Sequence, residues 1–288
     1  MIVAVASGKG GTGKTTVAVS LALAAVAEGN APVALLDCDV ESPDDALFLD
    51  AEFDRKQECG LPVPEVDAEV CNLCGRCTEV CEFHALTVLP DRVLVFPGLC
   101  HGCGSCVSNC PESAIRERLR VIGLLEAGHA GELAFARGTL RVGEAMATPV
   151  IRQLKQWQLN GRTRPQTIIL DAPPGTACPV VETVRGADFA LLVTEPTPFG
   201  LHDLEQAVDV IRDVLRIPVG VVINREMGSD PRVGDYCARA GVPILLRIPF
   251  DRRVAEAYSE GIPLIEAEPA YGQVFRTLLS SIAAEVDS

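Results

Sequence analysis

A glycine-rich loop between an apolar run and a stretch of helical length is the feature that most constrains the fold of this 288-residue chain. Residues 2–6 predict a short buried strand, and residues 17–28 predict a helix that stops at Gly29. The loop between them contains Gly8, Lys9, Gly10, Gly11, Thr12, Gly13, Lys14, Thr15 and Thr16. Strand, loop and helix in this order are the context in which a phosphate-binding P-loop is found.

The residue types of the loop suit the phosphates of ATP with Mg²⁺. Glycines let backbone N–H groups point at phosphate oxygens, and the helix N-terminus adds partial positive charge. We expect Lys14 to reach the β- and γ-phosphates and the hydroxyl of Thr15 to bind magnesium. The alternative is a merely flexible turn. The predicted nucleotide contacts are Gly10, Gly11, Thr12, Gly13, Lys14, Thr15 and Thr16.

Further apolar runs alternate with helix-compatible stretches along the chain. Strands are predicted at 32–37, 167–171, 189–193, 219–223 and 243–248, and helices at 149–159, 200–215, 233–240 and 252–259. A pair of strands at 119–125 and 133–142 is expected around a turn at 126–131. This alternation predicts an α/β fold, with a mostly parallel sheet covered by helices on both faces.

Between residues 58 and 117 the sequence becomes rich in cysteine and looks inserted. The pattern C-x2-C-x2-C-x3-C occurs twice, with the second copy 29 residues after the first. We therefore expect residues 58–117 to form a small α+β domain, and residues 1–57 and 118–288 to form the two parts of the α/β domain. The copies contain Cys71, Cys74, Cys77 and Cys81, and then Cys100, Cys103, Cys106 and Cys110.

This cysteine spacing is the bacterial ferredoxin arrangement, in which the fourth cysteine of each motif binds the other cluster. It predicts one [4Fe-4S] cluster on Cys71, Cys74, Cys77 and Cys110, and a second on Cys100, Cys103, Cys106 and Cys81. The last motif is followed by Pro111, as in ferredoxins, whereas Glu82 follows Cys81. A structural zinc site is the alternative, because C-x2-C pairs also bind zinc.

The loop string from Lys9 to Thr16 resembles the deviant Walker A motif of the MinD/ParA/Mrp superfamily, whose relatives include the nitrogenase iron protein. The resemblance implies that Lys9 crosses a homodimer interface to touch the partner's nucleotide. The alternative for Lys9 is a solvated loop charge. Residues Asn224 and Pro249 resemble adenine-contacting positions of the family, although Asn224 could be an ordinary turn residue.

Two strand-end segments resemble the nucleotide switches of the same superfamily. The resemblance implies that Asp39 positions the attacking water, that Asp37 lies in the outer shell of magnesium and that Asp171 holds a magnesium-bound water. It also implies that Gly175 lies near the γ-phosphate. The alternative is that such aspartates only cap the following helix. Cys178, seven residues after Asp171, resembles in placement the cluster-ligating cysteine of the nitrogenase iron protein.

The net charge of the chain limits the kinds of molecule that it can bind. Lys plus Arg number 25 against 39 Asp plus Glu, and the formal net charge of −14 disfavours nucleic acid and anionic membranes. No apolar run approaches the roughly 20 residues of a membrane span. The start lacks a basic leader and the chain has twelve cysteines, so we expect a cytoplasmic, reducing environment without a membrane anchor.

The whole chain thus resembles a MinD-superfamily P-loop ATPase carrying an inserted two-cluster ferredoxin domain. The resemblance implies slow MgATP hydrolysis in a nucleotide-sandwich homodimer, coupled to electron transfer through two [4Fe-4S] clusters to a redox or cluster-accepting protein, with a second related ATPase as one candidate. One alternative is a cluster or metallocofactor assembly ATPase, which the lack of a C-x2-C outside the insert weakens. The other is an ATP-switched scaffold, which would not explain eight cysteine ligands.

Overall fold

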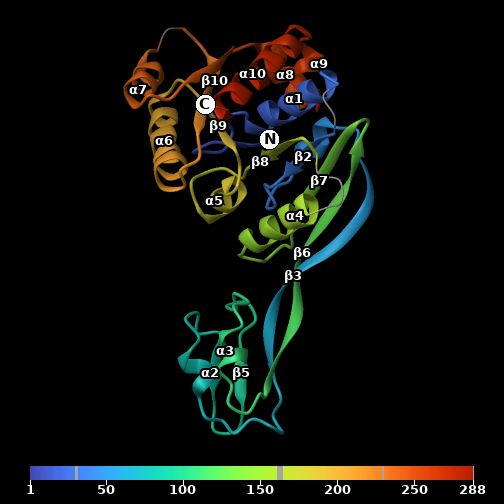
Figure 1. The fold of residues 1–288 in the computed structure, drawn as a ribbon, viewed down its shortest axis with the longest axis vertical. Helices are drawn as coiled ribbons and strands as arrows, with labels where there is room; N and C mark the ends of the chain where they lie inside the picture. Colours follow the sequence, from blue (N-terminus) through green and yellow to red (C-terminus); the bar gives the residue numbers. More distant parts are fainter. Residues whose placement is uncertain (30–31, 161–164, 229, 288) are drawn as a thin grey trace.

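The computed structural model describes residues 1–29, 32–160, 165–228 and 230–287, and shows a large body joined to a small lobe by a two-stranded ribbon (Figure 1). The body is built on one nine-stranded sheet of order β11-β10-β9-β1-β8-β2-β7-β6-β3. Strands β11 to β7 in that order are parallel, and β6 and β3 are antiparallel additions. The strands are β1 (Ile2–Ala6), β2 (Val33–Asp37), β3 (Glu52–Val66), β6 (Ile115–Ala130), β7 (Leu133–Leu140), β8 (Thr167–Asp171), β9 (Phe189–Thr194), β10 (Val219–Glu226) and β11 (Ile244–Pro249).

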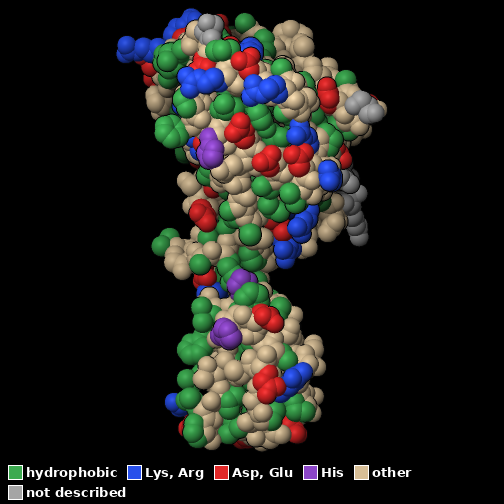
Figure 2. All heavy atoms as spheres, turned by 90° about the vertical axis from the view of Figure 1, so that its left-hand side faces the viewer, with side chains coloured by type: hydrophobic (Ala, Val, Ile, Leu, Met, Phe, Trp, Pro, Cys, Tyr) green, Lys and Arg blue, Asp and Glu red, His purple; other side chains and the backbone are tan. Residues whose placement is uncertain are grey.

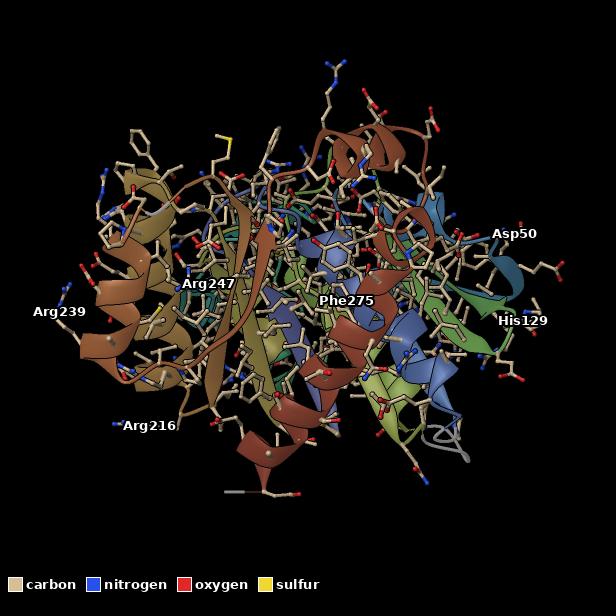
Figure 3. All side chains as sticks on the ribbon, turned by 90° about the horizontal axis from the view of Figure 1, so that it is seen from above. Asp50, His129, Arg216, Arg239, Arg247 and Phe275 are labelled. Atoms are coloured by element: carbon tan, nitrogen blue, oxygen red, sulfur yellow. The ribbon has the colours of Figure 1, made fainter. Side chains whose placement is uncertain are left out.

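Helices cover both faces of the sheet, which confirms the predicted fold class. The hydrophobic core of one face includes residues of α1 and α10, and that of the other includes residues of α4, α5, α6 and α7. Phe275 of α10 is fully buried in the first of these cores (Figure 3). The helices of the body are α1 (Lys14–Ala27), α4 (Thr148–Leu159), α5 (Cys178–Val184), α6 (Pro198–Val208), α7 (Arg232–Ala240), α8 (Arg252–Ser259), α9 (Leu264–Ala267) and α10 (Ala270–Val286).

Most predicted elements are present, with two corrections. The strand expected at 119–125 extends from Ile115 to Ala130, so the turn expected at 126–131 is reduced to the short link before β7. The helix expected at 200–215 is α6 followed by a π-helical turn, Asp209–Val214. The described helices include none with the length and apolarity that crossing a bilayer requires.

The ribbon is the part of β3 and β6 that extends beyond the sheet. The two strands pair from Glu52 opposite His129 to Val66 opposite Ile115, but β7 pairs with β6 only as far as Gly123. The rest of the pair projects from the body to the lobe, and a space-filling view shows a narrow waist between them (Figure 2). The boundaries predicted after residues 57 and 117 fall inside these continuous strands, so that domain division stays a prediction.

A β-bulge marks the place where the ribbon leaves the sheet. Cys59 pairs with Gly123 but Gly60 pairs with Val121, so Ile122 is an extra residue on β6. A bulge of this kind bends its strand and increases the local twist. The two strands of the ribbon approach each other closely here, because a Cβ on Gly60 would lie 2.4 Å from the carbonyl oxygen of Arg120.

The lobe, residues 67–114, repeats its backbone as it repeats its cysteines. It contains the short helices α2 (Arg76–Glu79) and α3 (Ser105–Ser108) and the hairpin β4 (Leu86–Val88) and β5 (Val93–Val95). Residues with positive φ recur at the same interval of 29, as Leu73 and Gly102, Gly75 and Gly104, and His84 and Ser113. The duplication seen in the sequence is therefore also a duplication of conformation.

Candidate functional site

The glycine-rich loop joins β1 to α1 and holds its two key side chains in the interior. Gly13, with φ of 91°, is the N-cap of α1, and Lys14 and Thr15 are its first residues, both largely buried. The Asn224 amide donates to the Thr12 carbonyl oxygen at 2.8 Å, and a Cβ on Gly13 would lie 2.3 Å from the same amide nitrogen. Asn224 of β10 therefore holds the glycine-rich loop in its conformation through contacts with Thr12 and Gly13.

Two strand ends bring the predicted switch aspartates together. Asp37 of β2 is in register with Asp171 of β8, because these strands are neighbours in the sheet. The Thr15 hydroxyl donates to Asp171 Oδ2 at 2.7 Å and also lies 3.2 Å from Asp44 Oδ1. Asp171 Oδ1 and the buried hydroxyl of Thr12 have no hydrogen-bond partner. A buried loop with such unused polar atoms fits a phosphate and its magnesium.

Acidic groups are concentrated at this edge of the sheet. Asp37 accepts hydrogen bonds from the backbone N–H of Asp39 at 3.1 Å and of Asp45 at 3.2 Å. Burial raises the pKa of Asp37, Asp45 and Asp171, and their mutual repulsion adds to the rise for Asp37 and Asp45. Burial also raises the pKa of Asp39 to about 6, although nearby Lys14 lowers it. The sequence reasoning missed Asp44 and Asp45, for which the only signal was two acidic residues just beyond the first switch.

A pocket opens beside the loop, where the predicted adenine contacts lie. Asn224 and Pro249 line it together with Gly11, Gly13 and Thr16 of the loop. The remaining wall is mostly apolar with polar ends, a composition that suits a flat nucleobase. It consists of Arg225, Ile248, Phe250, Asp251, Val254, Ala255, Tyr258 and Leu264. Gly10 is not among the residues that line the pocket, and a Cβ built on it would be 3.9 Å from Pro174 of the second switch segment.

Lys9 forms an ion pair within its own chain. Its Nζ lies 3.2 Å from Glu195 Oε2, and Arg225 donates to the other oxygen of the same carboxylate at 2.7 Å. The side chain of Glu195 is 15% exposed and that of Lys9 is 32% exposed. Its predicted role across a dimer interface stays a prediction. No motif in the sequence points to Glu195, which directly follows β9.

The cysteines of the lobe line two cavities in the crossed grouping that the sequence predicts. One cavity is lined by Cys71, Cys74, Cys77 and Cys110, and the other by Cys81, Cys100, Cys103 and Cys106. Each group thus takes three thiols from one motif and one from the other. None of the twelve cysteines is in a disulfide.

The spacing of these thiols disfavours zinc. Four sulfurs around one zinc ion, each 2.3 Å from the metal, must lie about 3.8 Å from one another. Among the described residues, no three cysteine sulfurs all fall within 4.8 Å of each other. The wider arrangement fits a cube, in which each thiolate binds a different iron.

Backbone N–H groups point at several of the sulfurs. Ala85 N donates to Cys81 Sγ and Ala114 N to Cys110 Sγ, both at 3.3 Å, in equivalent positions of the two repeats. Gly102 N donates to Cys100 Sγ at 3.4 Å. Such donors stabilise the negative charge of a thiolate bound to iron.

Cys178 lies apart from the cysteines of the lobe. It is the exposed first residue of α5, seven positions after Asp171. Among the described residues, it belongs to no group of three or more potential ligands. The other three cysteines of the body, Cys38, Cys59 and Cys237, are buried.

Helix α4 connects the segment after Asp171 to the root of the ribbon. Lys155 of α4 is buried and donates to the carbonyl oxygens of Glu182, Thr183 and Arg185 at the end of α5, each at 2.7 Å. Two residues before it, Gln153 binds the backbone of Gly60 at the bulge. Side chains of α4 therefore bind both the end of α5 and the bulge at the root of the ribbon.

The chain matches known proteins over nearly its whole length. It is 32% identical over 263 residues to an uncharacterized protein of Methanocaldococcus jannaschii, covering 91% of this chain and 90% of that one. It is 28% identical to the iron-sulfur cluster carrier protein of Deinococcus radiodurans, covering 99% of this chain and 69% of that one.

The fold also matches solved structures of low sequence identity. The septum site-determining protein MinD of Pyrococcus horikoshii, complexed with Mg-ADP, has a TM-score of 0.58 at 19% identity, with 100% of this chain and 98% of that one covered. A ParA family ATPase of Chlorobium tepidum has a TM-score of 0.58 at 15% identity, with 98% and 97% covered. Residues 3–264 match the sequence profile of the CobQ/CobB/MinD/ParA nucleotide binding domain. Since the profile spans the loop, both switch segments and the lobe between them, the chain belongs to this family and is a P-loop ATPase of the MinD/ParA type.

Proposed function

We propose that this ATPase holds two resident [4Fe-4S] clusters and uses MgATP to control electron transfer through them to a partner protein. The observation that carries the proposal is the crossed grouping of eight thiols around two cavities. The first group has one buried thiol, that of Cys77, two half-buried thiols and one exposed thiol, that of Cys74, whereas the second has three buried thiols and one exposed, that of Cys103. Three ligands of each group are thus at least half-buried, and such ligands with backbone donors favour clusters that stay over clusters that are handed on.

Each part of the nucleotide site has a proposed task. Lys14 neutralises the β- and γ-phosphates, while the Thr15 hydroxyl and Asp171 hold magnesium directly or through water. Asp39 orients the attacking water from the end of the first switch segment. Phosphoryl transfer needs mainly such positioning and charge compensation, so no covalent help from the protein is required. Magnesium, when bound, would neutralise negative charge on the phosphates.

Self-association completes the proposal. Lys9 would leave Glu195 and reach the nucleotide of a second copy, so that hydrolysis requires a dimer. Helix α4 would pass movement of the second switch segment to the ribbon, because its side chains bind both α5 and Gly60. The lobe then changes position or exposure with the nucleotide state. Electrons would come one at a time from a low-potential donor and leave to the partner while the dimer is closed.

The test is an anaerobic preparation with counted iron and sulfide. We expect about eight irons per chain, retained when MgATP and an apo-acceptor protein are added, and a midpoint potential that differs between ADP and a non-hydrolysable ATP analogue. The Lys14→Ala variant is the control, since it should keep its iron but show no nucleotide effect. Identical potentials and identical hydrogen exchange in the lobe in all nucleotide states would refute the coupling.

Cluster carriage is the second candidate, and the name of the Deinococcus radiodurans relative favours it. In that case irons beyond about eight would bind and leave intact to the acceptor in a manner that depends on ATP. Cys178 would be the residue to replace first, because its thiol is exposed close behind the second switch segment. If Cys178→Ser transferred clusters to the acceptor as the parent does, the transferred clusters would have to come from the lobe.

A further inference from the structure

The repeat of 29 residues relates the two cysteine cavities of the lobe, so the residues that line them can be compared position by position. Val88 lines the first cavity, whereas its counterpart Glu117 lines the second. The repeat thus replaces an apolar side chain with a carboxylate at this position. The first cavity is the one lined by Cys71, Cys74, Cys77 and Cys110, and the second is the one lined by Cys81, Cys100, Cys103 and Cys106.

Glu117 brings a negative charge without a cationic partner to the second cavity. Its Oε1 lies 3.3 Å from the position that a Cβ on Gly104, the N-cap of α3, would take. Burial is the main cause that raises the pKa of the Cys100 thiol, and the charge of Glu117 adds to the rise. Within the described part of the chain, Glu117 forms no ion pair with lysine or arginine.

The charged side chains of the first cavity are compensated. Arg76 lines it, where the second cavity has the neutral Ser105, and the arginine lies 3.1 Å from Glu79. The carboxylate that lines this cavity, Glu112, accepts a hydrogen bond from the amide of Asn72 at 2.9 Å. A cation and a hydrogen-bonded carboxylate therefore lie at the first cavity, whereas the second has a carboxylate alone.

The repeat also exchanges a polar pair for an aromatic one. His101 and Phe83 of the second cavity are the counterparts of Asn72 and Glu112, and their rings stack with centroids 3.6 Å apart and planes at 10°. Three thiols are buried in the second group but only one, that of Cys77, in the first. The negative charge that a cluster gains on reduction is therefore less well solvated in the second cavity.

These differences disfavour the addition of an electron in the second cavity. A carboxylate repels the added negative charge, and burial behind aromatic rings limits the access of water to it. The hydrogen bond from Gly102 N to Cys100 Sγ acts in the opposite direction, as one neutral dipole against a net charge. Backbone donors to Cys81 and Cys110 occupy equivalent positions, so they do not distinguish the cavities.

We propose that Glu117 gives the second cavity the lower reduction potential, so that an electron shared by two clusters is held mainly in the first cavity. The inference rests on the proposed function, which supplies both clusters and a one-electron donor of low potential. Passing the electron oxidises the second cluster and reduces the first by one electron each, and no bond or proton changes place.

The positions of the cavities along the ribbon give the transfer a direction. Pro62 and Pro64 of β3 line the second cavity, whereas Val66, at the far end of the ribbon, lines the first. The electron therefore moves away from the ATPase body. The partner protein would receive it at the outer cavity, where the Cys74 thiol is exposed.

The test is a redox titration of the cluster-containing protein under argon, followed by the electron paramagnetic resonance of the reduced clusters. We expect two midpoint potentials in the parent, of which Glu117→Gln should raise only the lower. The preference of the electron for the first cavity should fall roughly three- to ten-fold, which is about 30–60 mV for a one-electron couple. The matched control is Glu112→Gln, at the first cavity, which should leave the lower potential unchanged.

A reciprocal variant tests the same idea without altering the second cavity. Val88→Glu places a carboxylate at the counterpart position and should lower the higher potential, whereas the neutral Val88→Gln should lower it much less. If Glu117→Gln lost its iron, this pair would decide, and equal potentials in Val88→Glu and Val88→Gln would overturn the proposal.

Two results in the parent and in Glu117→Gln would also overturn the proposal. One is a single midpoint potential for both clusters of the parent, and the other is an unchanged lower potential in Glu117→Gln. Iron analysis separates these outcomes from failure of the proposed function. Far fewer than about eight irons in the parent would refute the two resident clusters, whereas eight irons with an unchanged potential would refute only the role of Glu117.

Discussion

The side-chain amide of Gln153 forms two hydrogen bonds with the backbone of Gly60, accepting from its N–H at 3.2 Å and donating to its carbonyl oxygen at 3.0 Å. Gly60 lies at the bulge where the ribbon leaves the sheet. A helix that is also fixed to α5 therefore holds the ribbon at its root.

Gln153→Ala should release the ribbon from α4. Two hydrogen bonds of about 1 kcal/mol each are lost, so hydrogen exchange at the bulge should quicken by roughly ten- to thirty-fold. ATP hydrolysis should continue, but the effect of nucleotide on exchange in the lobe should shrink. Gln156→Ala, an exposed position of the same helix, is the control. A nucleotide effect that persists unchanged in Gln153→Ala would exclude α4 as the connection.

Lys155→Met should destabilise the body strongly. Three carbonyl oxygens at the end of α5 lose their donor, and each unmade hydrogen bond costs about 1 kcal/mol or more, so unfolding by urea should show a loss of about 3 kcal/mol. Arg152→Gln removes the neighbouring ion pair with Glu182, in which the arginine is 53% exposed. That loss should stay below about 1 kcal/mol. Equal losses in the two variants would contradict the assigned importance of the buried lysine.

Glu195→Gln should favour association of the ATP-bound protein. Removing a partly exposed partner of Lys9 frees that lysine at a gain of about 0.2–1 kcal/mol, which lowers the protein concentration at half-association up to five-fold. Sedimentation of the protein with a non-hydrolysable ATP analogue measures this change. Glu226→Gln, which breaks a different arginine pair, should have no effect.

Lys9→Ala tests whether the same lysine is needed for hydrolysis in the dimer. It should bind nucleotide as the parent does, yet its hydrolysis rate should no longer rise with protein concentration. Normal, concentration-dependent hydrolysis by Lys9→Ala would rule out a sandwich dimer completed by this residue.

Paired cysteine variants distinguish crossed from uncrossed ligation. If Cys71 and Cys110 share a cluster, the double variant with serine at both positions should keep about four irons per chain. Serine at both Cys100 and Cys110 should instead remove ligands from both clusters and leave almost none. Iron analysis of the two anaerobically purified proteins gives the answer, and the reverse pattern would show that each motif holds its own cluster.

Local patterns made much of this molecule predictable. The strand, loop and helix around Lys14 and the parallel strands that end in Asp37 and Asp171 follow from short stretches of sequence. The grouping of Cys110 with the first motif and of Cys81 with the second also follows from spacing, and the structure brings these thiols together while their iron ligation stays a prediction.

The remaining features depend on residues far apart in the chain. The pairing of β3 with β6 joins segments separated by the whole lobe, and the mixed, partly exposed sequence of β3 has no strand periodicity that would predict it. Contacts such as Gln153 with Gly60, or Lys9 with Glu195, involve polar residues that have no local pattern at all. These residues are brought together only when the sheet has assembled.

The bulge at Gly60 makes the ribbon a lever. From Gly60 to Val66 the ribbon spans six residue steps, an arm of about 20 Å at about 3.3 Å per residue. A rotation of about 10° at its root would move the far end by about 3–4 Å. A side-chain adjustment within the ATPase body that turned the root by this amount would be magnified into a displacement large enough to open or close a protein contact at the lobe.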